Sequence, residues 1–309
     1  MTETESSAAQ PQAAYYPVTV SNYNYAKEPV DITFERCPEK VLVLNQNNIE
    51  TMLALGLGDK IVAAAGLDHE VKAEYQADFE TINYLTDFTV SRESVLMLEP
   101  DMILGWWSTF GEKRLDSTDF WNERGVKTYM AENSNSIVEY RTLANEYDYI
   151  LDLGKIFDVE DKAQAIVDEI QAQVQQIVDQ SKDMEKRSAL IIEFLGDSIY
   201  TYDKTTLGGD MAITVGADLL DTPEQTIGLE DLIELDPQVI FVVYMDGDEE
   251  GMAEKSVANV TDNEALSSLT AVKNGDVYAI PRGDMYTSAM RTADGLEIFA
   301  NGLYPELAK

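Results

Sequence analysis

Polar and aromatic side chains follow the apolar runs that the sequence predicts to be buried strands. Asn45, Gln46 and Asn47 follow the run at 40–44, and Trp106 with Trp107 closes the run that begins at residue 102. Ligands of open parallel sheets bind beyond the carboxyl ends of the strands. Aromatic rings at that edge would offer flat, adaptable contact to a chelate or a macrocycle. Because successive strand residues face opposite ways, we expect at least one indole ring to leave the core; the alternative is that both are buried there.

Further candidates follow other predicted strands. They are Asp68, His69, Phe194, Tyr244, Met245, Arg282, Met285 and Tyr286. Arg282 carries a bidentate fork suited to carboxylate or catecholate oxygens, although a surface salt bridge is an equal alternative. Lys204 is the second candidate cation in these loops. The strand-end loops therefore offer few positive charges to a ligand.

The counts of cysteine and histidine limit the available chemistry. Cys37 is the only cysteine, so no internal disulfide can form, and His69 is the only histidine. A single histidine excludes His-rich zinc or manganese sites and argues against a His-based triad. We expect no catalytic residue and no resident metal or cofactor.

The sequence patterns of common enzymes on doubly wound folds are absent. No Gly-x-Gly-x-x-Gly follows a predicted strand, and neither Gly-Lys-Ser/Thr nor Gly-x-Ser-x-Gly occurs. Phosphate-binding loops and the hydrolase nucleophile elbow therefore find no support. Paired carboxylates carry no information in a chain with 57 acidic residues. A binding protein is favoured over an enzyme, and over an adhesion or scaffold protein.

The chain is strongly acidic, with 22 basic and 57 acidic residues and a formal net charge of −35. Such a chain will not bind nucleic acid through a general phosphate-binding surface, and the charge argues against adhesion to anionic lipid. Solubility is the simplest role of this charge. No apolar run is long enough to cross a bilayer.

Residues 1–14 are polar and rich in small side chains. This composition is typical of a flexible tether that builds no core of its own. We interpret Met1 as an artificial start, with an upstream targeting segment removed. The alternative is a disordered N-terminus of a cytosolic protein.

Strands and helices alternate on both sides of a central stretch, which predicts two α/β lobes at 15–135 and 187–309. A hairpin is expected from the runs at 18–25 and 30–34. The first lobe should have strands at 40–44, 61–65, 102–106 and 126–130, with helices at 49–55, 92–98 and 116–124. The second lobe should have strands at 189–194, 199–202, 239–244 and 277–280, with helices at 208–215, 229–235, 263–269 and 291–303.

The stretch at 136–186 predicts two consecutive helices between the lobes. Ser136 and Glu139 have the spacing of a capping box, and Gly154 is a candidate break between the helices. Asp158 is the expected N-cap of the second helix, which would run to about Lys186 and span roughly 40 Å. We expect it to join the lobes; the alternative is a segment of coiled coil.

One supersecondary pattern occurs twice. The segments Glu93–Gly105 and Glu230–Val242 each begin with glutamate, continue with apolar residues at helical spacing, and then have Leu-acid-Pro before an apolar strand. Pro100 and Pro237 are 137 positions apart (237 − 100), as are the two glutamates (230 − 93). The equal offset favours two lobes of like construction.

In the order and spacing of these stretches, the chain resembles the solute-binding proteins of ABC importers for iron–siderophore complexes, haem and corrinoids. The matching stretches are Arg36–Leu44, Glu50–Ile61, Glu93–Leu104, the long connecting helix, Glu230–Phe241, Gly275–Arg282 and Asp294–Pro305. The resemblance implies an α/β fold of two Rossmann-like lobes with mostly parallel sheets, joined by a single long α-helix. The ligand would lie in the cleft between lobes that move little on binding.

The resemblance also implies partners. One acidic residue on the outer tip of each lobe would pair with arginines of the membrane permease, and Glu93 and Glu230 are the matching positions. The alternative is that each is a first-turn glutamate favoured by the helix dipole. The protein would be a monomer, lipid-anchored at the extracellular face of the cytoplasmic membrane.

The implied ligand is a ferric siderophore-type complex. Because the loops offer few cations, we expect a neutral or weakly charged chelate, such as a hydroxamate, or a corrinoid. Haem stays open as an alternative, with His69 as an iron ligand and a tyrosine or methionine opposing it.

Overall fold

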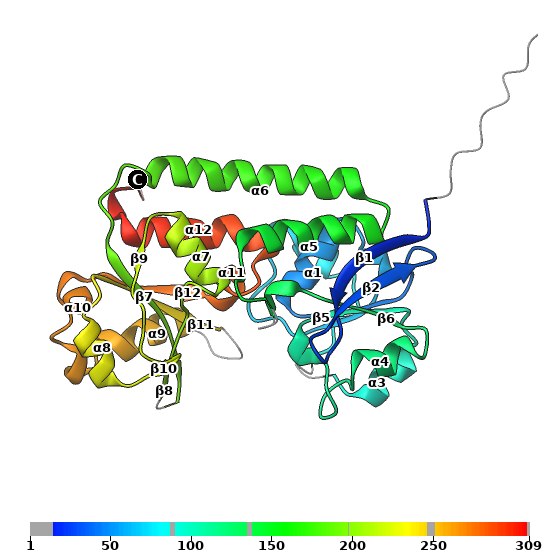
Figure 1. Ribbon diagram of the computed structural model, residues 1–309, viewed down its shortest axis with the longest axis horizontal. Coiled ribbons are helices and arrows are strands. Elements are labelled where there is room, and N and C mark those ends of the chain that lie inside the picture. Colours follow the sequence, from blue (N-terminus) through cyan, green and yellow to red (C-terminus); the bar gives the residue numbers. More distant parts are fainter. Residues whose placement is uncertain (1–14, 87–89, 135–137, 197, 246–250, 308–309) are drawn as a thin grey trace, which may run out of the picture.

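The computed structural model describes residues 15–86, 90–134, 138–196, 198–245 and 251–307. Two α/β lobes lie side by side, and the long helix α6 (Glu160–Ser181) runs across the top of both (Figure 1). The predicted architecture of two lobes joined by one long helix is confirmed.

The N-terminal lobe is built on a four-stranded parallel sheet in the order β4-β3-β5-β6. Its strands are β3 (Val41–Leu44), β4 (Ile61–Ala65), β5 (Met102–Gly105) and β6 (Lys127–Met130). Every residue of β3 and β5 is buried, as the uninterrupted apolar runs indicate for strands covered on both faces. The helices are α1 (Gln46–Ala54), α2 (Gln76–Phe79), α3 (Arg92–Leu98) and α4 (Thr118–Asn122). The expected hairpin is the antiparallel pair β1 (Val18–Tyr23) and β2 (Pro29–Phe34).

The C-terminal lobe has a six-stranded mixed sheet in the order β10-β8-β7-β11-β12, with β9 paired to β7. The core strands β7, β11 and β12 are parallel, whereas β8 and β10 are antiparallel. The strands are β7 (Ser188–Leu195), β8 (Ser198–Thr201), β9 (Asp218–Leu219), β10 (Thr226–Ile227), β11 (Val239–Tyr244) and β12 (Val277–Pro281). The helices are α7 (Leu207–Thr214), α8 (Leu229–Leu235), α9 (Met252–Thr261), α10 (Thr270–Asn274), α11 (Arg282–Met285) and α12 (Thr292–Leu303).

In the C-terminal lobe one predicted helix is wrong and one helix was not predicted. The helix expected at 263–269 is only a 3₁₀ turn at Glu264–Leu266, and α10 follows it. Asn263 caps that turn by accepting the N–H of Ala265. The longer helix α9 precedes it and was not predicted.

The first connecting helix, α5 (Leu143–Ile156), begins later than the capping-box pattern predicts. Ser136 lies outside the described residues, and Glu139 precedes the helix. Tertiary hydrogen bonds hold the chain where α5 begins: the N–H of Arg141 donates to the Thr205 carbonyl at 3.0 Å, and the N–H of Leu143 donates to Asp210 at 2.9 Å. These contacts are long-range, so local sequence could not reveal them.

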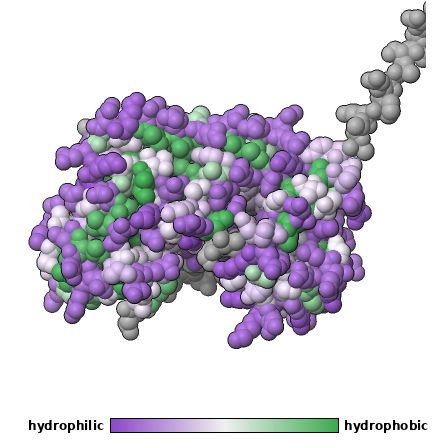
Figure 2. All heavy atoms as spheres, in the orientation of Figure 1, coloured by the Kyte–Doolittle hydropathy of each residue, from purple (hydrophilic) through white to green (hydrophobic). Residues whose placement is uncertain are grey.

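Helix α6 is 22 residues long and spans about 33 Å at 1.5 Å per residue. Asp158 is not its N-cap, because this residue has φ 56° and Val159 precedes the helix. Gly154 does not end α5 either. A Cβ on Gly154 would lie 2.5 Å from Cβ of Ala163, so the glycine permits close packing of α5 against α6. Figure 2 shows hydrophilic residues along the outer edge of α6 and a band of hydrophobic residues below it.

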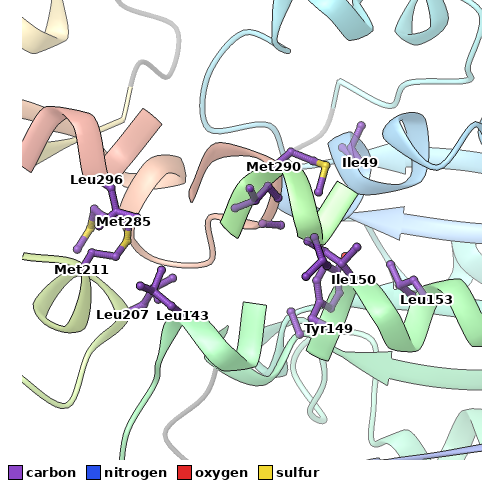
Figure 3. Packing of buried hydrophobic residues seen from close by; sticks show 14 of the residues in the cluster. Ile49, Leu143, Tyr149, Ile150, Leu153, Leu207, Met211, Met285, Met290 and Leu296 are labelled. Atoms are coloured by element: carbon purple, nitrogen blue, oxygen red, sulfur yellow. The ribbon is translucent and has the colours of Figure 1, made fainter. Parts of the chain in front are cut away.

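A single hydrophobic cluster continues from one lobe to the other beneath α6. It includes Ile49 of α1, Ile150 of α5, Met211 of α7, Met285 of α11 and Leu296 of α12, all fully buried (Figure 3). Helix α6 packs against both α5 and α12. The lobes are therefore held by continuous apolar packing as well as by the long helix.

Polar contacts also join the lobes. Arg291, which precedes α12, donates from Nη2 to Glu50 Oε1 on α1 at 2.7 Å and from Nε to Oε2 at 2.8 Å. Lys72 of the N-terminal lobe pairs with Asp294 of α12 at 2.7 Å. Because Glu50 is completely buried, its charge depends on Arg291 for compensation.

Helices α3 and α8 confirm the repeated pattern. Both have seven residues, and each ends at an acidic residue in the left-handed region, Glu99 with φ 48° and Asp236 with φ 37°. Val95 and Leu232 occupy equivalent positions and are completely buried. The two helices lie at the outer ends of the lobes, far from α6 (Figure 1).

Candidate functional site

A cavity of about 230 Å³ lies at the carboxyl ends of β3, β4 and β5. Its lining comes from the N-terminal lobe except for Arg282, which the C-terminal lobe contributes. The lining residues are Leu44, Asn45, Ala65, Val90, Trp106, Ser108, Thr109, Arg114, Leu115 and Arg282. The cavity is thus an element of the junction between the lobes.

Asn45 lines this cavity and links the strand ends around it. It has φ 75°, a left-handed conformation that asparagine tolerates better than most residues. Its N–H donates to the Ala65 carbonyl at 2.9 Å, and its Oδ1 accepts the N–H of Trp106 at 3.3 Å. The three strand ends are therefore tied together around the cavity.

Gln46 and Asn47 bond to segments next to the cavity and do not line it. Both precede the helix predicted at 49–55, but they form the first turn of α1 and are 1% and 2% exposed. Oε1 of Gln46 accepts the N–H groups of Asp68 and His69 at 3.0 and 3.1 Å. Gln46 thereby positions the loop after β4, and Asn47 Oδ1 accepts the indole N–H of Trp106, so both amides bond to protein groups around the cavity.

Trp106 is the indole that lines the cavity. Its Nε1 donates to Asn47 Oδ1 at 2.8 Å, and its ring centroid lies 5.2 Å from that of Tyr286 in the C-terminal lobe. The guanidinium carbon of Arg282 lies 5.7 Å from the Trp106 ring, a cation–π contact. Three predicted residues from both lobes thus meet at one place.

Arg282 already has an anionic partner. Its Nη2 donates to Asp68 Oδ1 at 3.0 Å, across the lobe junction. Burial opposes its charge, but Asp68 more than compensates and raises the pKa of Arg282 above its usual value. A ligand anion would therefore have to compete with Asp68 or share the guanidinium with it.

The segment after β5, which was not predicted to take part in the site, closes the cavity. Thr109 Oγ1 accepts the N–H of Trp106 at 3.1 Å, and a Cβ on Gly105 would lie 2.9 Å from that oxygen. Gly105 thus lets the chain turn back, which brings Ser108 and the exposed Arg114 to the cavity. Gly105 at the end of β5 was the one sequence feature that could have indicated this turn.

A second cavity, of about 220 Å³, lies at the carboxyl ends of β7 and β11. It includes the predicted residues Phe194, Tyr244 and Met245. The remaining lining residues are Glu193, Val242, Val243, Met252, Lys255, Ser256 and Asn259. The ring of Tyr244 lies 5.5 Å from that of His69, edge to face, so this cavity also reaches the lobe junction.

His69 is buried, at 8% exposure, between the two lobes. A Cβ on Gly283 would lie 3.3 Å from its Cδ2, so the backbone of α11 approaches the imidazole closely. To bind a haem iron, His69 would have to leave these contacts. Among the described residues, no group of three or more His, Cys, Asp or Glu side chains could hold a metal ion.

Three further predicted site residues line neither cavity and have contacts within their own lobes. Trp107 stacks on Tyr25 at 5.2 Å within the N-terminal lobe. Met285 is completely buried in the core against Gly208, so we leave it out of the proposed site. Lys204 is exposed and pairs with Asp221 at 2.9 Å.

Glu93 and Glu230 are exposed in the first turns of α3 and α8. Each therefore lies at the outer end of its own lobe (Figure 1). None of the helices in the described part of the chain is both long and apolar enough to span a membrane.

The sequence pattern of the family described as periplasmic binding protein matches residues 41–282. The chain belongs to this family. The resemblance found in the sequence is thereby confirmed, and the family consists of binding proteins rather than enzymes.

Individual proteins agree with this membership. A periplasmic binding protein from Veillonella parvula has a TM-score of 0.83 and 35% identity, over 94% of this chain and 93% of that one. A protein of the ABC-type Fe³⁺-hydroxamate transport system from Saccharomonospora viridis has a TM-score of 0.77 and 23% identity, over 94% of this chain and 99% of that one. The uncharacterised ABC transporter substrate-binding lipoprotein YvrC of Bacillus subtilis is 26% identical over 311 residues, covering 98% of this chain and 90% of the relative.

Proposed function

We propose that this protein is the solute-binding component of an ABC importer and that it captures a ferric siderophore-type complex between its lobes. The observation that carries the proposal is the meeting of Trp106, Tyr286 and Arg282 at the junction, beside the strand-end cavity. Aromatic faces suit a chelate, and the guanidinium suits its oxygen atoms.

The sizes of the cavities bear on how the ligand binds. Each cavity, at about 230 and 220 Å³, is smaller than the roughly 300–1,000 Å³ of common small-molecule sites. A siderophore complex would therefore have to engage both cavities. This requires it to displace contacts at the junction, with Arg282 and Asp68 as the first candidates.

The ligand class follows from the charges at the junction. Arg282 is paired with Asp68. Arg114 and Lys255 are the other cations that line the two cavities, and Glu193 opposes them, so a strongly anionic tricatecholate would meet little net positive charge. We favour a neutral or weakly charged chelate, such as a ferric hydroxamate, and the name of the Saccharomonospora viridis protein is consistent with this choice. A corrinoid is the alternative ligand, and haem is disfavoured because His69 is buried against the other lobe.

A titration of tryptophan fluorescence tests this proposal. Ferric hydroxamate, ferric tricatecholate, cobalamin and haemin would be added in turn to wild type, Trp106→Phe and Trp107→Phe. We expect saturable quenching by the hydroxamate, most of it lost in Trp106→Phe. Trp107→Phe is the matched control and should retain the response, because this ring stacks on Tyr25. Absence of saturable quenching by all four compounds would contradict the proposal.

We further propose that Glu93 and Glu230 dock the protein onto the permease. Their exposure, their equivalent positions in two like helices and their place at the outer ends of the lobes support this role. Attachment to the membrane by a lipid anchor is proposed on the printed name of the Bacillus subtilis relative, a lipoprotein.

A further inference from the structure

The outer helices of the two lobes repeat an exposed aliphatic residue as well as a glutamate. Leu96 and Ile233 are 137 positions apart (233 − 96), the offset that also separates Glu93 from Glu230 (230 − 93). Each follows its glutamate by three residues, so the two side chains are neighbours on one helical face. Leu96 is 44% exposed and Ile233 is 37% exposed.

These aliphatic side chains are not part of the face that anchors each helix. Val95 and Leu232 provide that anchor and are completely buried. Seven large hydrophobic side chains are exposed in the described part of the chain, and four of them lie on these two short helices: Leu96, Met97, Leu229 and Ile233. Apolar surface is therefore concentrated beside both glutamates, in a chain that is otherwise strongly acidic.

We propose that each glutamate and its aliphatic neighbour form one docking unit, Glu93 with Leu96 and Glu230 with Ile233. The proposal rests on the function proposed above, because its occupant is the permease of the same importer. The permease surface that binds each unit would present a cation next to an apolar pocket. Because the unit occurs twice with the same spacing, the partner must offer this surface twice, as two like transmembrane subunits would.

The two halves of a unit contribute to different steps of docking. The carboxylate attracts a cation over distances set by the Debye length, so it governs the rate of association and is weakened by salt. The aliphatic group acts only after contact, through apolar area removed from water, and is insensitive to moderate salt. Removing the aliphatic pair should therefore accelerate dissociation equally at all salt concentrations.

Binding kinetics on the permease reconstituted in lipid nanodiscs separate these contributions. We expect about ten-fold weaker binding of the variant Leu96→Ser with Ile233→Ser, at low and high salt alike. Ile213→Ser is the matched control, since Ile213 is 42% exposed on α7, and it should bind as wild type does. The variant Glu93→Gln with Glu230→Gln should lose affinity chiefly at low salt. Affinity for the ferric chelate and melting temperature should stay unchanged in all of them.

The possible results distinguish this inference from the proposed function. Equal binding by the serine pair and Ile213→Ser would overturn the inference, while a loss in the glutamine pair would leave glutamate docking intact. A loss in the serine pair alone would support the apolar contact and contradict the glutamates. No loss in either pair would overturn both. Leu96→Gln with Ile233→Gln, which preserves helix propensity, repeats the test if serine lowers the melting temperature, and the same loss is expected.

Discussion

The outer helices of the two lobes repeat each other, whereas the junction between the lobes does not. Helices α3 and α8 share their length, their buried anchor, their left-handed acidic end and their exposed glutamate. At the junction, one cavity is lined by Trp106 and the other by Phe194 and Met245. A repeated surface suits a partner with two like subunits, and an unrepeated one suits a single asymmetric ligand. Substitutions in the outer helices should therefore affect docking, whereas substitutions at the junction should affect ligand binding and stability.

The largest effect is expected from the buried ion pair at the junction. Arg291→Met would leave Glu50, which is completely buried, without its compensating charge. Breaking such a pair costs about 3–5 kcal/mol. Urea unfolding should show this loss in the free energy of unfolding. Lys204→Met, which breaks the exposed pair with Asp221, is the control and should cause no measurable change. Equal losses in the two variants would contradict the role of the junction.

The next effect concerns pH and Glu146 of α5. Burial raises the pKa of Glu146 from 4.5 to about 7, although hydrogen bonds from Asn133 and from the N–H of Ala289 act in the opposite direction. The folded protein therefore keeps a proton that the unfolded chain releases. The stabilisation that protonated Glu146 gives to the folded protein is fully present below about pH 4.5. It falls by about 3 kcal/mol as the pH rises to about 7, and then levels off.

Urea unfolding of wild type and Glu146→Gln at several values between pH 4.5 and pH 8 tests this expectation. The substitution removes the titrating proton, so stability should depend less on pH in the variant. Burial also raises the pKa of Asp284, to about 6. Some dependence of stability on pH should therefore persist in the variant. Parallel curves for the two proteins would show that Glu146 does not titrate in this range.

A smaller effect is expected from Arg282→Lys. Lysine keeps a positive charge beside Asp68 but loses the planar fork that also contacts Trp106. We expect about ten-fold weaker binding of a ferric chelate, corresponding to roughly 1.4 kcal/mol. Arg124→Lys is the matched control, since Arg124 is exposed at the end of α4. An unchanged affinity in Arg282→Lys would place the chelate elsewhere.

Local signals predicted the outer helices better than the junction. Helices α3 and α8 have the predicted bounds, because the buried prolines Pro100 and Pro237 follow their last turns and fix where the strands begin. The start of α5 was not predicted because it depends on Thr205 and Asp210, more than 60 positions along the chain, which bond to Arg141 and Leu143.

The candidate site was predictable only in part. The rule that ligands bind at strand ends selected Trp106, Tyr244 and Arg282, and the structure brings all three to the junction. It could not tell Trp106 from Trp107, since the choice depends on Tyr25, a residue of another segment, as the stacking partner. Arg114 was missed because its approach to the cavity depends on how the chain turns back after Gly105.

The central claim is that the repeated outer helices serve the permease and the junction serves the ligand. Its most direct test is the variant Glu93→Arg with Glu230→Arg, in which the initial rate of ferric chelate uptake and the chelate affinity of the purified protein are both measured. We expect uptake to be abolished while the dissociation constant stays within about two-fold of wild type, because both residues lie on exposed outer turns. Unchanged uptake by this variant would contradict the account.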